Sequence, residues 1–100
     1  MKPARLTPPA RTELRNAAAW YAERSPRLGR DFVTEVRRTL EMIEAFPGMG
    51  APVPYVAESD TRRFPIRRFP YQVVYVELED RLEVIAIAGD SQRPGYWTAR

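Results

Sequence analysis

Apolar side chains between residues 8 and 45 recur every three or four positions, the spacing of one face of an α-helix. Two such stripes are present: Ala10, Leu14, Ala17, Ala18 and Tyr21, then Phe32, Val36, Leu40 and Ile43. Ser25-Pro26 separates them, because the residue before a proline leaves the helical region and proline suits a first helical turn. Thr7 can cap the first helix, with Pro8 at its first position. The pattern predicts a helical hairpin.

The period changes to two after residue 60. Phe64 and Ile66 alternate with polar neighbours, and residues 71–78 and 81–88 form two runs rich in β-branched and aromatic side chains. Only Glu79-Asp80 separates these two runs, so we expect an antiparallel hairpin. The second half of the chain therefore predicts a three-stranded meander.

The remaining segments are short. Lys2–Leu6 predicts a first strand, with Pro3 at its start or on an edge of the sheet. Phe46–Pro52 contains two glycines and two prolines and ends the second helix, so we expect a loop to about Asp60.

Together the elements predict an α+β fold in the order β-α-α-β-β-β, with the helix pair packed on the apolar face of the sheet. A chain of 100 residues that is 44% hydrophobic and 29% charged has the composition of a globular protein. We expect a single domain over residues 1–100 with one core.

Several classes of function are made improbable by composition. The longest apolar stretches are far shorter than the roughly 20 residues that span a bilayer, and the N-terminus has no signal-peptide pattern, so we expect a cytoplasmic protein without a membrane partner. Cysteine and histidine are both absent, which excludes disulfides and histidine base catalysis. We expect no metal site and no cofactor.

Arginine dominates the basic residues. The net charge is +3, and Lys2 is the only lysine among sixteen basic side chains. Arginine favours planar, bidentate contacts with carboxylates or phosphates, which suggests an anionic partner surface. A GC-rich genome would produce the same bias, so the distribution of the arginines has to decide.

The motif RRFPIRRFPYQVVYV from Arg62, followed by RPGYW from Arg93, resembles the ParE/RelE toxin superfamily. Trp20-Tyr21, Leu28-Gly29 and the FPGMG that ends the second helix agree with it. The resemblance covers nearly the whole chain. It implies the toxin of a type II toxin–antitoxin system, associated with plasmid stabilization. It also implies a hetero-oligomer with a ParD-like antitoxin whose N-terminal part, and not the toxin, binds specific DNA.

The superfamily contains two mechanisms. RelE-like members resemble ribosome-dependent endoribonucleases that cut messenger RNA, and ParE-like members resemble inhibitors that bind DNA gyrase. RNA cleavage requires a proton acceptor, a cation beside the phosphate and an acid for the leaving oxygen. Arg67, Arg93 and Tyr96 are the residues that a ribonuclease would use here. Arginine does not titrate near neutral pH and an ordinary tyrosine has a pKa near 10, so a base is hard to find.

One departure from the superfamily favours binding over catalysis. Many members carry a histidine and several arginines before the RPGYW ending, whereas this chain has Gly89 at the histidine position and Asp90-Ser91-Gln92 after it. We therefore expect a ParE-like gyrase inhibitor with no catalytic residues. The alternatives are a RelE-like endoribonuclease, a toxin that has lost part of its active surface, and a non-toxic module that only binds its antitoxin.

The resemblance and the strand alternation suggest two sets of contact residues. The residues expected to contact the target are Arg62, Arg63, Arg67, Arg93, Tyr96 and Trp97. Those expected to contact the antitoxin are Trp20, Arg63, Arg67 and Tyr75. For Trp20, Tyr96 and Trp97 the alternative is a packing role.

The arginines after Arg62 can also be placed on the expected strand. Alternation puts Arg63 and Arg67 on one side, opposite Phe64 and Ile66. Arg68 then falls on the apolar side, where it either ends the strand or pairs with a carboxylate of the second helix, such as Glu41 or Glu44.

Overall fold

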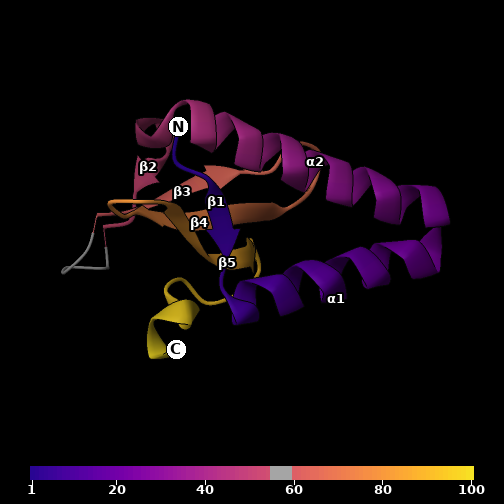
Figure 1. Cartoon of the computed structure of the whole chain (residues 1–100). Helices are drawn as coiled ribbons and strands as arrows, with labels where there is room; N and C mark the ends of the chain where they lie inside the picture. Colours follow the sequence, from indigo (N-terminus) through magenta and orange to yellow (C-terminus); the bar gives the residue numbers. More distant parts are fainter. Residues whose placement is uncertain (55–59) are drawn as a thin grey trace.

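A helical hairpin covers one face of a five-stranded sheet in the computed structural model, which describes residues 1–54 and 60–100 (Figure 1). The elements in chain order are β1 (Ala4–Leu6), α1 (Pro8–Arg24), α2 (Pro26–Ala45), the 3-10 turn η1 (Pro47–Met49), β2 (Ala51–Pro52), β3 (Thr61–Pro65), β4 (Tyr71–Glu77), β5 (Leu82–Gly89) and the 3-10 turn η2 (Tyr96–Ala99). The predicted α+β class is confirmed.

The sheet has the order β1-β5-β4-β3-β2. The strands β3, β4 and β5 form the predicted antiparallel meander. The predicted first strand is present, its pairing was not predicted, and one further strand differs from the prediction. The strand β1 lies parallel to β5, because the helical hairpin returns the chain to the other end of the sheet, as crossover connections do. The two-residue strand β2 pairs with β3 inside the segment that we expected to be a loop.

The predicted helix boundaries are confirmed. The Thr7 hydroxyl accepts a hydrogen bond from the Ala10 amide at 3.3 Å, and Pro8 occupies the first helical position. Ser25 has an extended backbone that ends α1, and α2 begins directly after it at Pro26. Gly29 lets the helices approach closely, since a Cβ there would lie 2.7 Å from the Cβ of Ala22.

The main core lies between the helices and the sheet. Its buried residues are Ala10, Ala17, Phe32, Val36, Ile43, Ile66, Phe69, Val73, Tyr75, Leu82, Val84 and Ile87. The ring of Tyr21 packs against those of Phe32 and Phe69, with centroids 5.3 and 4.9 Å apart. Both predicted apolar stripes therefore face the sheet.

A smaller cluster covers the opposite face of the sheet. It contains Val53, Val74, Ala86, Ala88 and Trp97. The register between β4 and β5 shifts after Val74, so that Ile85 is an extra residue in β5, as in a β-bulge. The turn η2 near the C-terminus folds back beside β5 (Figure 1). Its Trp97 belongs to this cluster.

The strand β3 is shorter than predicted. It ends at Pro65, and Arg67 and Arg68 lie in the following turn, where Arg68 has a positive φ of 73°. Their expected positions on the strand are therefore wrong. Arg68 does pair with a carboxylate of α2, but with Asp31 at 3.5 Å and not with Glu41 or Glu44.

Candidate functional site

A shallow groove, which we call the sheet groove, lies on the face of the sheet opposite the helices. Its volume is about 150 Å³. It is lined by Arg63, Gln72, Val74, Ala88, Gly89, Asp90, Gln92, Arg93, Pro94, Tyr96 and Trp97. Arg63 pairs with Val74 in the sheet, and the segment after β5 folds back beside it. The fold thus brings together four of the six residues that the sequence assigned to target contact.

The polar lining of the sheet groove has mixed charge. Arg63 is half-buried and Arg93 is exposed, and within residues 1–54 and 60–100 neither forms an ion pair. Asp90 lines the same groove, and its carboxylate accepts a hydrogen bond from Gln72 at 3.4 Å. A carboxylate beside two guanidinium groups suits the mixed surface of a protein partner and opposes the approach of a phosphate.

The hydroxyl of Tyr96 points away from solvent toward α1, where it donates a hydrogen bond to Glu13. Burial and the Glu13 carboxylate raise the pKa of Tyr96 above its ordinary value, despite the opposing effect of Arg100. The phenol is therefore held protonated and does not serve as a proton acceptor at neutral pH.

Glu13 is the centre of a hydrogen-bonded cluster, which we call the Glu13 cluster, with Tyr96, Arg100 and the Ile87 amide. Arg100 donates to both carboxylate oxygens, at 2.6 and 3.2 Å, and the Ile87 amide donates at 3.0 Å. Arg100 also donates to the Ile85 carbonyl at 2.7 Å. These bonds fix η2 against α1 and β5.

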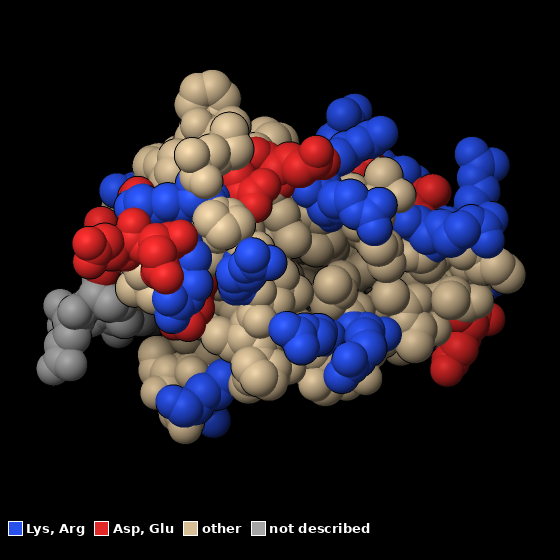
Figure 2. Space-filling view, viewed as in Figure 1, with Lys and Arg blue, Asp and Glu red and all other residues tan. Residues whose placement is uncertain are grey.

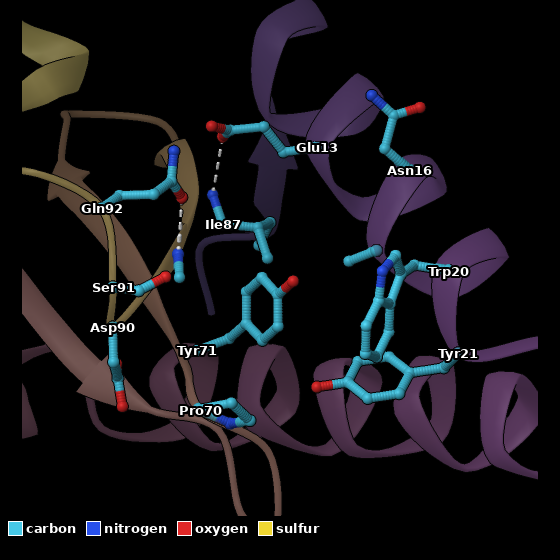
Figure 3. Close-up of a pocket in the computed structure, with 12 residues that line it drawn as sticks. Glu13, Asn16, Trp20, Tyr21, Pro70, Tyr71, Ile87, Asp90, Ser91 and Gln92 are labelled. Atoms are coloured by element: carbon cyan, nitrogen blue, oxygen red, sulfur yellow. Dashed lines mark hydrogen bonds between the residues drawn. The ribbon is translucent and has the colours of Figure 1, made fainter. Parts of the chain in front are cut away.

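A larger groove, the α1–β5 groove, lies between α1 and the end of β5. Its volume is about 740 Å³. Its lining residues, most of them labelled in Figure 3, are Glu13, Asn16, Ala17, Trp20, Tyr21, Pro70, Tyr71, Ile87, Gly89, Asp90, Ser91 and Gln92. Trp20 is 49% exposed and carries the guanidinium of Arg24 over its ring at 3.3 Å. An exposed tryptophan beside a groove is a typical anchor for a protein partner.

The model of the family described as the ParE toxin of the type II toxin–antitoxin system parDE matches residues 4–94. The chain belongs to the ParE toxin family. The chain is also similar in structure to a chain titled as the chromosomal ParDE toxin–antitoxin system from P. aeruginosa, with a TM-score of 0.75 and 16% identity. That match covers 89% of this chain and 96% of the other. Among curated proteins, no sequence matches this one.

Two of the arginines predicted at the target-binding surface of this ParE-family toxin lie outside the sheet groove. Arg62 pairs with Tyr75 on the helix-facing side of the sheet, and its guanidinium donates to the Gly50 carbonyl at 2.8 Å. Arg67 is exposed in the turn after β3. Of the predicted arginines, only Arg63 and Arg93 line the groove.

Two predicted aromatic contact residues are buried. The side chain of Tyr75 has no exposed surface, and its hydroxyl donates to the Pro47 carbonyl at 2.7 Å and accepts from the Gly50 amide at 3.1 Å. Tyr75 therefore offers no side-chain atom to an antitoxin. Trp97 is 7% exposed and packs on the sheet, which was its alternative role.

The basic side chains of the ParE-family chain do not form one continuous patch on the face seen in Figure 2. They lie in several groups separated by acidic and uncharged side chains. The arginine content alone therefore does not define a nucleic-acid surface. Among the described residues, no group of three or more acidic side chains could hold a metal ion, and no helix is long and apolar enough to cross a membrane.

Sequence reasoning missed Glu13, Asp90 and Arg100. Glu13 falls outside the apolar stripe of α1, and nothing local marks a carboxylate whose partners are more than 70 residues away. Asp90 was noted only as a departure from the superfamily. Arg100 lies beyond the RPGYW motif and beyond residues 4–94 matched by the family model.

Proposed function

We propose that this ParE-family toxin inhibits DNA gyrase by binding it through the sheet groove, and that a ParD-like antitoxin neutralises it. The observation that carries this proposal is the chemistry of three side chains that line the groove, Arg63, Arg93 and Tyr96. Within the described part of the chain, the guanidinium groups of Arg63 and Arg93 form no ion pair, while the phenol of Tyr96 is held protonated against Glu13. This arrangement supplies binding contacts, and neither the two guanidinium groups nor the protonated phenol can accept a proton; Asp90, a carboxylate in the same lining, accepts a hydrogen bond from Gln72.

The ribonuclease alternative needs a base near the reacting hydroxyl. Tyr96 has a raised pKa, which is the wrong direction for that role. The acceptor oxygens of Glu13 are occupied by Tyr96, Arg100 and the Ile87 amide. Arg67, the third residue assigned to a ribonuclease, lies outside the groove. These observations support a binding mechanism.

The antitoxin has a separate surface in this proposal. Trp20, which the sequence assigned to antitoxin contact, lines the α1–β5 groove on the edge of the molecule next to the sheet groove. Gln92, Asp90 and Gly89 line both grooves, so an antitoxin in one would reach the border of the other. Neutralisation would then follow from covering or reshaping the target surface. A cytoplasmic location and a role in plasmid stabilization remain predictions from the sequence.

The test combines two assays of the purified protein. One measures supercoiling by DNA gyrase, and the other probes a translation extract for cut messenger RNA. We expect inhibited supercoiling and intact message. The double variant Arg63→Glu/Arg93→Glu should raise the inhibitory concentration by about tenfold or more, because it reverses both charges that face the partner.

The matched control is Arg27→Glu/Arg37→Glu, which makes the same charge change at two exposed positions of α2. It should inhibit gyrase as the wild type does. Message cut only on ribosomes would replace the proposal with the RelE-like mechanism. No effect in either assay, together with normal growth of cells that express the chain without antitoxin, would identify a non-toxic module.

A further inference from the structure

Three charged side chains line the sheet groove, and they come from two parts of the chain. Arg63 lies on β3, where it pairs with Val74 of β4, whereas Asp90 and Arg93 belong to the segment that follows β5. Among the described residues that line this groove, Asp90 is the only acid. The groove therefore offers two cations and one anion to the molecule that binds it.

The turn that carries Asp90 is fixed to the sheet by hydrogen bonds. The Asp90 amide donates to the Pro70 carbonyl at 2.9 Å. Two residues later, the side chain of Gln92 accepts a hydrogen bond from the Gly89 amide at 2.7 Å, which is the dashed line at Gln92 in Figure 3. The turn is thus held on both sides of Asp90, which presents its carboxylate from a defined position beside the groove.

The carboxylate of Asp90 is not neutralised by the cations that share the groove. Within residues 1–54 and 60–100 it forms no ion pair, and its hydrogen bond comes from the uncharged amide of Gln72, at 3.4 Å. Asp90 is exposed in the free toxin, so water solvates the charge. A partner that covers the groove buries this charge, which is costly unless the partner supplies a cation.

This charge discriminates between the two kinds of anionic partner that arginines attract. A nucleic acid presents phosphates, and its affinity rises with the number of phosphates that cations neutralise. Because the groove has a volume of only about 150 Å³, a phosphate that enters it approaches Asp90 as well as the arginines. At equal distance the repulsion by one carboxylate cancels the attraction by one guanidinium. A protein surface can instead match each charge with its opposite.

We propose that Asp90 determines the selectivity of the sheet groove. Its carboxylate repels nucleic acid and binds an arginine or lysine of DNA gyrase, on a segment whose acidic side chains bind Arg63 and Arg93. A purely structural role, accepting the hydrogen bond from Gln72, needs an oxygen at this position but no charge. The inference rests on the proposed function in taking gyrase as the partner, whereas the repulsion of nucleic acid does not depend on the target.

The experiment measures two properties of the full chain and of its Asp90 variants. One is the concentration that halves supercoiling by DNA gyrase. The other is the affinity for a short fluorescein-labelled single-stranded RNA, followed by fluorescence anisotropy at about 0.15 M salt, where exposed charges more than about 8 Å apart are largely screened. Asp90→Asn keeps an oxygen that can accept from Gln72 and removes the charge, Asp90→Arg reverses the charge, and Asp90→Glu preserves it.

The two measurements should move in opposite directions. Asp90→Asn should bind the RNA several-fold more tightly and should need a several-fold higher concentration to inhibit gyrase. Asp90→Arg should change both by about tenfold or more, and Asp90→Glu should stay close to the wild type in both. Loss of the structure of the turn would weaken inhibition without strengthening RNA binding, so the opposite signs identify an effect of charge.

Glu79→Gln and Glu79→Arg are the matched controls. Glu79 is an exposed acid in the turn between β4 and β5, at the end of β5 opposite to Asp90, and it lies outside the groove lining. These variants make the same changes in net charge as Asp90→Asn and Asp90→Arg. Both measurements should stay within about twofold of the wild type, because the added charge is screened from the groove.

Several results would overturn the proposal. Unchanged gyrase inhibition by Asp90→Arg would remove the contact with a basic side chain of gyrase, and unchanged RNA affinity would remove the repulsion of nucleic acid. Cutting of the RNA by the wild type that Asp90→Asn abolishes would make this carboxylate a proton acceptor instead.

Failure of the proposed function is distinguishable from failure of this inference. A wild-type chain that leaves supercoiling intact removes gyrase as the target, and with it the contact between gyrase and Asp90. The RNA measurement still decides whether Asp90 repels phosphates. Conversely, a wild-type chain that inhibits gyrase, together with an Asp90→Arg variant that does so equally well, leaves the proposed function standing and removes only the role of Asp90 in binding gyrase.

Discussion

At the scale of a single residue, the carboxylate of Glu13 joins three parts of the chain. It lies on α1 and accepts from the Ile87 amide of β5 and from Tyr96 and Arg100 of the last turn. Charge-assisted hydrogen bonds of this kind are stronger than neutral ones, and the guanidinium compensates for partial burial of the carboxylate. One side chain therefore determines where the segment after β5 lies.

Tyr96→Phe tests this cluster. The change removes one hydrogen bond but keeps the ring, so we expect the free energy of unfolding at pH 8 to fall by about 1 kcal/mol. Gyrase inhibition should be unchanged, since the hydroxyl faces Glu13 and not the groove. Urea denaturation and the supercoiling assay measure the two effects. A large loss of inhibition with an intact fold would place the phenol in the functional surface.

The wild type and Tyr96→Phe should also differ in how their free energy of unfolding depends on pH. The folded-state pKa of Tyr96 is raised above its ordinary value of 10, so its contribution to stability is complete below pH 10 and is lost as the pH rises further. The difference in unfolding free energy between the wild type and Tyr96→Phe should therefore shrink above pH 10. The raised pKa values of Tyr21 and Tyr75 affect both proteins alike. A constant difference from pH 8 to 11 would contradict the Glu13 contact.

At the scale of secondary-structure elements, the two helices form a closely packed pair. The contact between them depends on Gly29, whose missing side chain leaves room for Ala18 and Ala22 of α1. The backbone carbonyl of Ala18 would lie 3.0 Å from an added Cβ, and a backbone atom cannot move away as a flexible side chain can. This is why the Leu28-Gly29 pair occurs near the start of α2.

Gly29→Ala should destabilise the protein by about 1–2 kcal/mol, because overpacking costs more than the gain in helix propensity. Gly48→Ala is the control, since a Cβ at Gly48 meets nothing within 4 Å. It should change stability by less than about 0.5 kcal/mol. Thermal or urea unfolding of both variants provides the measurement. Equal stability of the two variants would show that the hairpin can relax around the added methyl group.

How well each element could be predicted from the sequence depends on how far apart along the chain its interacting residues lie. The helices and the strands β4 and β5 have period, caps and turns in their own sequence, and they were predicted nearly to the residue, whereas β3 ends earlier than predicted, at Pro65. The strand β2 has two residues and the parallel partner of β1 lies far along the chain, so neither has a local signal. Arg63, Arg93 and Tyr96 were found as site residues, but the contact of Tyr96 with Glu13 joins positions 83 residues apart.

At the scale of the whole molecule, both faces of the sheet are covered, but by different structures. The helical hairpin covers one face, and a small cluster around Trp97 covers the other. Trp97 is the largest side chain of this second cluster and is 7% exposed. It completes the second layer beside the sheet groove.

Trp97→Ala should lower the free energy of unfolding by about 3 kcal/mol, the usual cost of removing a buried aromatic ring. Trp20→Ala is a control of the same chemistry, because Trp20 is 49% exposed, and it should cost less than about 1 kcal/mol. Denaturation followed by circular dichroism measures both. Equal losses would mean that the turn η2 contributes little to the stability of the sheet.

The strand order has a consequence for the timing of synthesis. The strand β5 lies between β1 and β4, yet it is the last of the strands to leave the ribosome. At the usual rate of about 5–20 residues per second, β1 and the apolar face of α1 wait several seconds for the strand against which they pack. A nascent chain interrupted before Leu82 therefore lacks the strand that joins β1 to β4, and a cell that makes this toxin produces no complete sheet until translation is nearly finished.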